Sequence, residues 1–293
     1  MKILVVGAKG QLGNEIMKLA SPIMHEWVFV DVNSEGGDVL KVDVTDRDQV
    51  SAIVTPDVDV IINCSAYNEV DKAEGDMEAA MKVNAYAVGL LAEAALKADA
   101  LLIHFSTDYV FDGKANVPYT EDCEPAPVNA YGRSKLAGER MVIGSGCRHM
   151  IFRTSWLYSL TGRNFFRTMA VKTAEMSSLK VVFDQTGTPT YAGDLAFLIK
   201  HIIDNGMLDR TGIYHYSNEG SATWYDFARE INDLLGYTCD VEPCRTGEYP
   251  SVALRPSYSV MDKKKVKETF GLPVPHWRES LRLLVREYER CDA

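Results

Sequence analysis

The chain has 293 residues, of which 46% are hydrophobic and 25% are charged, and its formal net charge is −10. This length is enough to bury the core of one large α/β domain, or of a nucleotide-binding domain with a smaller lobe, without disulfide or metal staples. The acidic balance repels phosphate backbones, so no nucleic acid is expected as a partner.

The sequence carries neither a targeting signal nor a metal-binding pattern. The apolar run Ile3–Val6 is too short for a signal peptide or a membrane span, so we expect no membrane partner. The cysteines form no C-x-x-C pair, and Cys239 and Cys244 lack His partners at zinc spacing. We therefore predict free thiols in a reducing cytoplasm and no metal site. The basic run Lys263–Lys265 is interpreted as a solvated helix start.

The first half of the chain alternates apolar, β-branched runs with helical patterns. Strands are predicted at 2–7, 27–31, 39–43, 58–63, 101–106 and 149–154. Helices are predicted near 11–20, 46–54, 76–98 and 129–143. The alternation predicts an α/β fold with a Rossmann-like, doubly wound parallel sheet. The strands are apolar throughout, as expected when helices cover both faces of the sheet.

After residue 155 the alternation is less regular. Helices are predicted near 163–177, 193–204, 223–235 and 276–290, and strands at 180–183 and 213–216. No linker separates this part from the first, so we predict a smaller C-terminal substrate lobe that is interleaved with the main domain. The predicted boundaries are 1–155 for the dinucleotide domain, with a returning segment at about 181–215, and 156–180 with 216–293 for the lobe.

A glycine-rich loop joins the first strand to the first helix. Residues Gly7–Gly13 have the pattern G-x-x-G-x-x-G. Glycines there permit a tight turn and let the backbone approach a pyrophosphate, which the helix N-terminus binds, so the loop predicts a dinucleotide site. Asp31, at the end of the second strand, favours the free 2′-hydroxyl of NAD, whereas Lys9 favours a 2′-phosphate, so NADH and NADPH both stay open. Asp43 and Val44, after the third strand, are candidates for contact with adenine.

A tyrosine and a lysine lie four residues apart in a predicted helix. Tyr131 and Lys135 share a face of that helix, about two dozen residues after Thr107 at the end of the fifth strand. Hydride delivery to a ketone builds negative charge on oxygen, so a proton donor and a hydrogen-bond donor are both needed. A nearby ammonium lowers the pKa of a phenol, which makes tyrosine a better acid. Asn84, in the preceding helix, is a candidate to support Lys135.

Together these features resemble the extended short-chain dehydrogenase/reductases. Longer blocks sharpen the resemblance to the dTDP-4-dehydrorhamnose reductase family. These blocks are Ser106–Gly113 (STDYVFDG), Phe152–Tyr158 (FRTSWLY), Asn164-Phe165, Asp184–Thr190 (DQTGTPT) and Arg255-Pro256. The resemblance runs from about residue 1 to residue 285.

The resemblance implies NAD(P)H-dependent reduction of the C4 keto group of a nucleotide-linked 6-deoxysugar, from dTDP-4-dehydro-L-rhamnose to dTDP-L-rhamnose. It assigns catalysis to Thr107, Tyr131 and Lys135. The cofactor residues are then Gly7, Gly10, Gln11, Leu12, Gly13, Asp31, Asp43, Val44, Asn63, Ser65, Ala66, Tyr67, Asn84, Tyr131 and Lys135. The substrate residues are Thr107, Asp108, Tyr109, Trp156, Asn164, Gln185 and Arg255, with Arg255 a suitable phosphate partner.

The chain departs from the family pattern at two places. Asn68 and Glu69 follow Tyr67, where the family usually has Thr, and this loop borders the substrate, so the exact sugar stays open. Some family members dimerise through magnesium held by carboxylates. Glu15 matches one such position, but Gly193-Asp194 stands where a second Glu is usual. We therefore predict no metal, and we keep a homodimer as a partner hypothesis.

The same fold also supports functions other than reduction. A dehydratase needs Asp and then Glu after the threonine, but Asp108 is followed by Tyr109, which disfavours dehydration. A sugar-nucleotide epimerase needs only the cofactor and Tyr131 and stays open. A non-catalytic regulatory subunit, resembling that of methionine adenosyltransferase, is also open. The complete Thr–Tyr–Lys set favours an active reductase.

Overall fold

The computed structural model describes residues 1–292 of the chain and the side chains of residues 1–290. Its main sheet is parallel, with the strand order β11-β6-β5-β4-β1-β2-β3. The strands are β1 (Lys2–Val6), β2 (Glu26–Asp31), β3 (Val39–Lys41), β4 (Val60–Asn63), β5 (Leu101–Thr107), β6 (His149–Thr154) and β11 (Gly212–His215). The order reverses between β1 and β4, where doubly wound sheets bind ligands at the carboxyl ends of their strands. The predicted Rossmann-like fold is confirmed.

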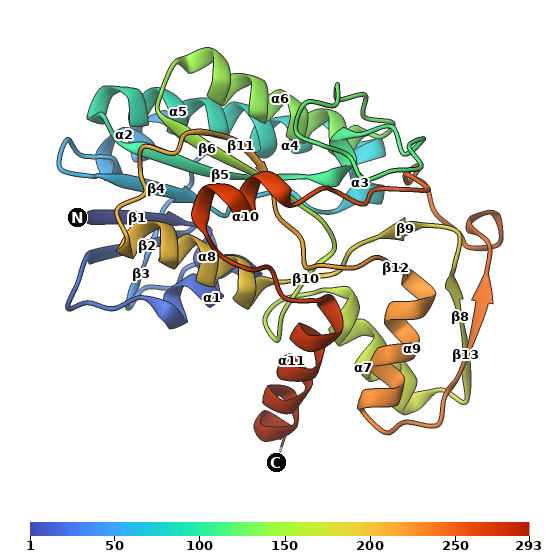
Figure 1. Cartoon of the computed structure of the whole chain (residues 1–293). Coiled ribbons are helices and arrows are strands. Elements are labelled where there is room, and N and C mark those ends of the chain that lie inside the picture. Colours follow the sequence, from blue (N-terminus) through green and yellow to red (C-terminus); the bar gives the residue numbers. More distant parts are fainter. Residues whose placement is uncertain (293) are drawn as a thin grey trace.

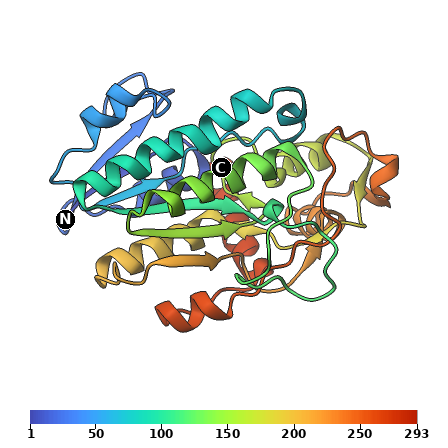
Figure 2. The same cartoon turned by 90° about the horizontal axis from the view of Figure 1, so that it is seen from above.

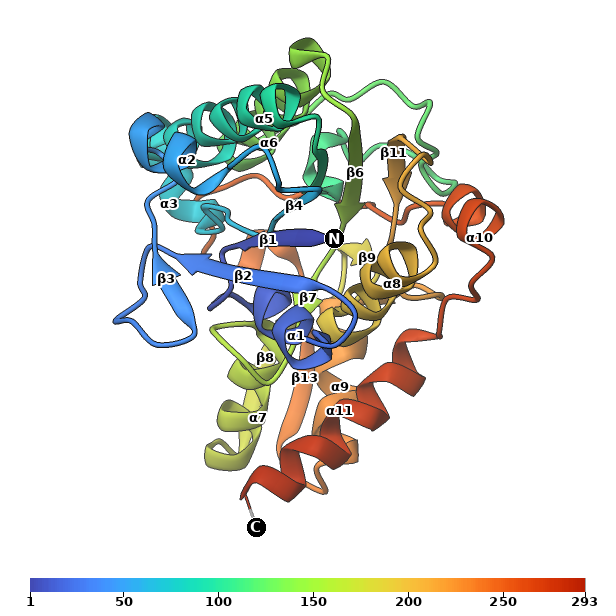
Figure 3. The ribbon, with the colours of Figure 1, turned by 90° about the vertical axis from the view of Figure 1, so that its left-hand side faces the viewer.

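Helices cover both faces of this sheet (Figure 2 and Figure 3). One layer contains α2 (Arg47–Ile53), α5 (Ala87–Ala98) and α6 (Ala130–Ser145), and the other contains α1 (Gln11–Leu19), α8 (Ala192–Asp204) and α10 (Lys264–Phe270). Side chains alternate along a strand, so Leu4 packs in the first layer while Ile3 and Val5 pack in the second. Each fully buried aliphatic side chain contributes roughly 1.5–3 kcal/mol, which explains why the strands are apolar throughout.

The helix predicted at 76–98 is interrupted by a π-helical turn. It consists of α4 (Met77–Met81), the turn η1 (Lys82–Tyr86) and α5, and the short helix α3 (Val70–Gly75) precedes it. A Cβ atom on Gly138 of α6 would lie 2.1 Å from the main-chain oxygen of Asn84, so α6 packs directly on the turn. Turns of this kind frequently occur at functional sites, and here the turn carries Asn84.

One helical run, Met77–Ala98, is long and apolar enough to cross a membrane by length and composition alone. Half of its most apolar window is buried inside the protein. Val88, Leu91 and Ala95 belong to the core between the helices and the main sheet. Its apolar character therefore has a packing explanation.

The smaller lobe contains α7 (Phe165–Glu175), α9 (Trp224–Leu234), α11 (Trp277–Asp292), β8 (Ser178–Val182) and β13 (Asp240–Cys244), seen at the lower right of Figure 1. It has its own core, which includes Phe166, Phe227 and Trp277. Between β8 and α9 the chain returns to the main sheet to add α8 and β11. Val266 and Phe270 of α10 pack in the core of the main sheet, although they lie in the range expected for the lobe.

Short elements complete the connections between these parts. They are β7 (Leu157–Tyr158), β9 (Thr186–Gly187), β10 (Thr190–Tyr191), β12 (Ala222–Thr223) and the 3₁₀ turns η2 (Asp108–Val110) and η3 (Thr246–Glu248). The pairs β7–β10 and β9–β12 lie where the two parts of the chain meet (Figure 1). The basic run expected as a solvated helix start precedes α10, which begins at Lys264, but Lys263 is buried and forms an ion pair with Glu219, so the run is not solvated throughout.

Candidate active site

The glycine loop has the geometry that a dinucleotide requires. Gly7 has φ of +75°, and a Cβ atom there would lie 2.7 Å from the backbone nitrogen of Ser65. A Cβ atom on Gly13 would lie 2.3 Å from the carbonyl oxygen of Gly7, so only glycine allows this turn to pack on α1. Gly10 is the N-cap and no side chain caps the first turn, which leaves the N–H groups of Gln11 and Leu12 for an anion. These residues fit a dinucleotide pyrophosphate.

The side chain of Asp31 stabilises this loop by hydrogen bonds. Its carboxylate accepts hydrogen bonds from the backbone N–H groups of Lys9 at 3.0 Å and Asn33 at 2.8 Å. The Lys9 side chain is exposed. Further along, the Asp43 carboxylate accepts from the backbone and hydroxyl of Thr45 in a tight turn, next to buried Val44. Asp31 thus sets the shape of the loop.

Asn63 organises the loop that follows β4. Its Oδ1 accepts from the backbone N–H of Ser65 at 3.1 Å and from the Ser65 hydroxyl at 2.6 Å. Its Nδ2 lies 3.2 Å from Nδ1 of His104, a fully buried residue of β5. Burial and the nearby Lys135 hold the pKa of His104 well below its usual value, so a neutral ring accepts from the amide. The loop continues through Ala66.

Asn84 joins this loop to helix α6. Its Oδ1 accepts from the backbone N–H of Tyr67 at 2.8 Å, and its Nδ2 donates to the Tyr67 carbonyl at 3.0 Å and to the Ser134 hydroxyl at 2.9 Å. Ser134 precedes Lys135 in α6. Asn84 therefore sets the position of Tyr67 relative to the helix that carries the Tyr–Lys pair.

Thr107 and Tyr131 meet at the carboxyl end of β5. The Tyr131 hydroxyl donates to Oδ1 of Asn68 at 3.4 Å, and the side chain of Thr107 lies near enough to this phenol to lower its pKa. The Thr107 hydroxyl donates to Oδ1 of Asp108 at 3.0 Å, and the ring of Tyr109 packs edge-on against that of Tyr131. The structure thus brings together four residues that the sequence analysis assigned to chemistry or substrate, and it adds Asn68.

The ionisable groups of this cluster are shifted mainly by burial. Burial raises the pKa of Tyr131, an effect that the hydrogen bond with Thr107 opposes and the charge of Asp108 reinforces. Burial raises the pKa of Asp108 to about 7, against hydrogen bonds from Ser259 and Thr107. Perturbed groups in contact with one another are typical of catalytic sites.

Lys135 lies one helical turn after Tyr131 and is fully buried. Its ammonium donates to the carbonyl oxygen of Phe105 at 2.6 Å. Burial lowers its pKa to about 8, although the negative charge of Glu139 and the Cys64 side chain oppose that shift. The fold therefore buries a cation one helical turn after Tyr131, at a substantial desolvation cost.

Two tryptophans stack on one another in the region that the sequence predicts to bind the substrate. Trp156 has φ of +46°, and its ring stacks on that of Trp224 with centroids 3.6 Å apart and an interplanar angle of 11°. Strained backbone of this kind is typical of binding and catalytic positions. Gln185 accepts from the indole N–H of Trp224 at 3.2 Å and donates to Thr246 at 3.0 Å. The sequence did not predict a role for Trp224, because a tryptophan at the start of a helix has the pattern of a core residue.

Two of the expected substrate residues are engaged within the protein. Arg255 forms a bidentate ion pair with Asp71, at 3.1 and 2.8 Å, and also hydrogen-bonds with Tyr109. Asn164 is the N-cap of α7: its Oδ1 accepts from the backbone N–H of Arg167 at 3.1 Å, and its Nδ2 donates to the Ser159 carbonyl at 2.8 Å. Arg255 therefore lies beside the catalytic cluster, whereas both atoms of the Asn164 amide hold the local backbone.

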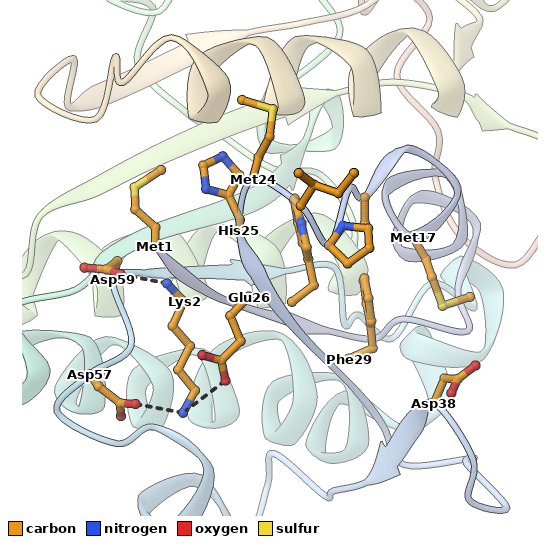
Figure 4. A pocket seen from close by; sticks show the side chains of 14 residues that line it. Met1, Lys2, Met17, Met24, His25, Glu26, Phe29, Asp38, Asp57 and Asp59 are labelled. Carbon is orange, nitrogen blue, oxygen red and sulfur yellow. Dashed lines mark hydrogen bonds and ion pairs between the residues drawn. The ribbon is translucent and has the colours of Figure 1, made fainter.

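A surface pocket also lies at the opposite end of β1 and β2 (Figure 4). Met1, Met24 and Phe29 line it, and at its edge the ammonium of Lys2 donates a hydrogen bond to the carboxylate of Asp57. The glycine loop follows the other end of β1, so this pocket is separate from the cluster described above. Among the described residues no group of three or more His, Cys, Asp or Glu side chains is arranged to hold a metal ion.

The glycine loop at a sheet reversal, with a Thr–Tyr–Lys set beside it, defines a nicotinamide-dependent oxidoreductase of the extended short-chain dehydrogenase class. A model of the RmlD substrate binding domain matches residues 1–290. The dTDP-4-dehydrorhamnose reductase of Burkholderia thailandensis is 37% identical over 98% of this chain and 99% of its own length.

Two further similarities agree. The crystal structure of the dTDP-4-dehydrorhamnose reductase of Bacillus anthracis in complex with NADP matches with a TM-score of 0.90 and 34% identity, covering 98% of this chain and 99% of that one. A relative from Streptomyces antibioticus, named as a probable dTDP-4,6-dihydroxy-2-methyloxan-3-one 4-ketoreductase, is 41% identical over 96% of this chain and 94% of its own length. The chain belongs to the dTDP-4-dehydrorhamnose reductase family.

Proposed function

We propose that this protein reduces the C4 keto group of dTDP-4-dehydro-L-rhamnose to give dTDP-L-rhamnose, with NADPH or NADH as the reductant. The observation that carries the proposal is the proximity of the Thr107 and Tyr131 side chains at the carboxyl end of β5, with the buried ammonium of Lys135 one helical turn after Tyr131. This cluster lies at the carboxyl end of β5, on the sheet edge that the glycine loop also occupies.

Each of these groups has a distinct part in the reduction. The bound nicotinamide supplies the hydride. Thr107 donates a hydrogen bond to the keto oxygen and orients it, while the Tyr131 phenol gives that oxygen its proton. Lys135 stabilises the phenolate that remains and hydrogen-bonds the nicotinamide ribose. Asn63 and Asn84 hold the loop Ser65–Tyr67 against the nicotinamide half of the cofactor.

The smaller lobe is proposed to bind the sugar nucleotide. Trp156 offers an aromatic face, and Arg255 offers a planar pair of N–H donors to the diphosphate. The bidentate bond of Arg255 to Asp71 means that a phosphate competes with that carboxylate or uses the remaining N–H groups. Gln185 keeps Trp224, and through it Trp156, in position.

A related 4-keto sugar nucleotide is the second candidate substrate. Asn68 contacts the Tyr131 hydroxyl, at a position where the family usually has threonine, and a side chain there borders the sugar. The name of the Streptomyces relative also points to ketoreduction at C4 of another dTDP sugar. We place the protein in the cytoplasm, since its five described cysteines are free, and we keep the homodimer as a hypothesis.

The decisive experiment is the loss of reduced-nicotinamide absorbance with dTDP-4-dehydro-L-rhamnose, run with NADPH and NADH in parallel. Rapid oxidation with formation of dTDP-L-rhamnose supports the proposal. A higher rate with NADH agrees with the preference expected from Asp31, and a higher rate with NADPH agrees with the preference expected from Lys9. Cofactor binding without oxidation contradicts this substrate. The same assay with other dTDP-4-keto sugars then tests the second candidate.

A further inference from the structure

A buried carboxylate extends the catalytic face of α6 by one more turn. Tyr131, Lys135 and Glu139 follow one another at intervals of four residues, so they share that face. Glu139 is 1% exposed. Neither the glycine loop nor the Thr–Tyr–Lys set explains a charged residue at this depth, because buried carboxylates are rare unless they are paired.

Glu139 is held by two neighbouring strands of the main sheet. Arg153 of β6 donates to both of its oxygens, from Nε at 3.0 Å and from Nη2 at 2.8 Å, and the hydroxyl of Ser106 in β5 donates to Oε1. Ser106 and Arg153 are paired in the β5–β6 register, and Ser106 directly precedes Thr107. The guanidinium of Arg153 also lies over the ring of Phe111, 5.2 Å from its centroid. One carboxylate thus joins the helix of Tyr131 and Lys135 to the strand of Thr107.

Stability alone is a poor reason for this arrangement. Two charges taken out of water lose hydration that their attraction only partly returns, and apolar side chains of similar volume are often equally stabilising. The position of Glu139 below Lys135 supplies another reason. Four titratable or polar groups interact with the Lys135 ammonium from the elements packed around it: the Phe105 carbonyl and His104 of β5, Cys64 after β4, and Glu139 of α6.

Only one of those groups is a carboxylate, and Arg153 donates to both of its oxygens. The pKa of the Cys64 thiol is raised by burial, so it stays neutral, and His104 is neutral because its pKa is lowered. Glu139 is therefore the charge that opposes the desolvation of Lys135, and the pKa of Lys135 is higher because of it.

We propose that Glu139, locked by Arg153 and Ser106, is a positioning residue of the reduction that keeps Lys135 in its charged form. This inference rests on the proposed function for its kinetic consequence, but the charge state of Lys135 is measurable without turnover. The active form in the reductive direction has Lys135 charged and Tyr131 protonated. The first proton leaves Lys135, because its pKa is about 8 whereas that of Tyr131 is raised above its usual value. Activity is therefore lost as pH rises through the pKa of Lys135.

The test is E139Q, which removes the charge and keeps the shape. We expect the basic limb of the kcat/KM profile to move down by about one pH unit, with about a fivefold loss at pH 8 and near wild-type rates at pH 6. In parallel, NMR titration of protein labelled with ¹³C at the lysine Cε atoms, with K135M to assign the signal, is expected to show the pKa of Lys135 lowered by the same amount.

Two further variants separate this role from a structural one. E139Q leaves Arg153 charged and unpaired, so E139Q/R153M removes both charges and serves if the single variant does not fold. D194N is the matched control, because Asp194 is also a mostly buried carboxylate but is bonded to Asn218 and Ser280 instead. We expect D194N to leave both titrations unchanged.

The outcomes are distinct. An unchanged Lys135 titration in a folded Glu139 variant overturns the inference, whatever the activity. An equal shift in D194N overturns it as well. A third outcome is a shifted Lys135 titration in a protein that does not oxidise NADPH with any tested dTDP-4-keto sugar. The shift then supports the effect of Glu139 on the charge of Lys135. The lack of turnover contradicts the proposed function, so this effect has no kinetic consequence.

Discussion

Tyr131 is the residue on which the proposed chemistry depends most directly. Its hydroxyl lies near Thr107 at the site where the keto oxygen is proposed to bind. We expect Y131F to lose at least about 100-fold in kcat, because a positioned general acid contributes roughly 10²–10⁴-fold. Cofactor binding, measured by quenching of protein fluorescence, is expected to stay near the wild-type value. Y225F, at a partly buried tyrosine of α9 in the smaller lobe, is the matched control, and full turnover by Y131F contradicts the assignment.

Asp108 gives a stability prediction at the same scale. Burial raises its pKa to about 7, so between about pH 4 and pH 7 the folded state holds a proton that the unfolded state has lost. The free energy of unfolding therefore falls as pH rises through that range. D108N has no charge to bury, so we expect it to be about 2–4 kcal/mol more stable than the wild type at pH 8 and nearly equal to it at pH 4.

Urea unfolding at the two pH values measures this difference. A D108N effect that is the same at pH 4 and pH 8 contradicts the linkage and indicates that the substitution acts through packing alone. Activity is a separate readout, because the Thr107 hydroxyl donates to Oδ1 of Asp108 and the amide oxygen of asparagine is a weaker acceptor than a carboxylate.

At the scale of elements, the contact between α6 and the π-helical turn η1 sets the position of the catalytic helix. A Cβ atom on Gly138 would lie 2.1 Å from the Asn84 carbonyl oxygen, so α6 must shift to accept one. We expect G138A to lower the free energy of unfolding by about 1–3 kcal/mol and to reduce kcat, because the shift moves Tyr131 and Lys135.

A second glycine of the same helix provides the control. A Cβ atom on Gly144 would meet no described atom within 4 Å. G144A is therefore expected to be neutral or to stabilise the protein by up to about 1 kcal/mol, from helix propensity alone. Thermal unfolding and turnover of both variants check the prediction, and equal effects at the two positions contradict it.

At the scale of the whole molecule, Arg255 connects the C-terminal segment to helix α3. Its partner Asp71 is 184 residues away in the sequence, and the ion pair holds the pKa of that carboxyl at about 2. If Arg255 also binds the diphosphate, R255A is expected to raise KM for the sugar nucleotide about 10–100-fold, the value of a charge-assisted hydrogen bond.

The dinucleotide does not depend on Arg255 in this proposal, so KM for NADPH is expected to stay unchanged in R255A. R278A is the matched control, because Arg278 forms an ion pair with Glu230 between α11 and α9, outside the cluster. Steady-state kinetics with each substrate varied in turn measures both constants. An unchanged KM for the sugar nucleotide in R255A contradicts the phosphate role.

The order of layers, the glycine loop and the Tyr131–Lys135 face were determined by the sequence itself. Each rests on a local regularity: apolar runs with turn residues between them, glycines at fixed spacing, or two residues one helical turn apart. β13 was missed because Pro243 lies inside it and a proline argues against a strand. The π-helical turn was missed because its composition does not differ from that of an α-helix.

Only the tertiary structure decided which side chains meet. Glu139 and Arg153, 14 residues apart, look like surface charges in the sequence, yet they pair in the core below Lys135. The substrate role predicted for Asn164 stays a prediction, and the structure adds that its amide caps α7. Trp156 and Trp224 stack although they belong to different segments. Periodicity records which face of an element is buried, but a partner depends on how distant elements pack, and no local pattern contains that information.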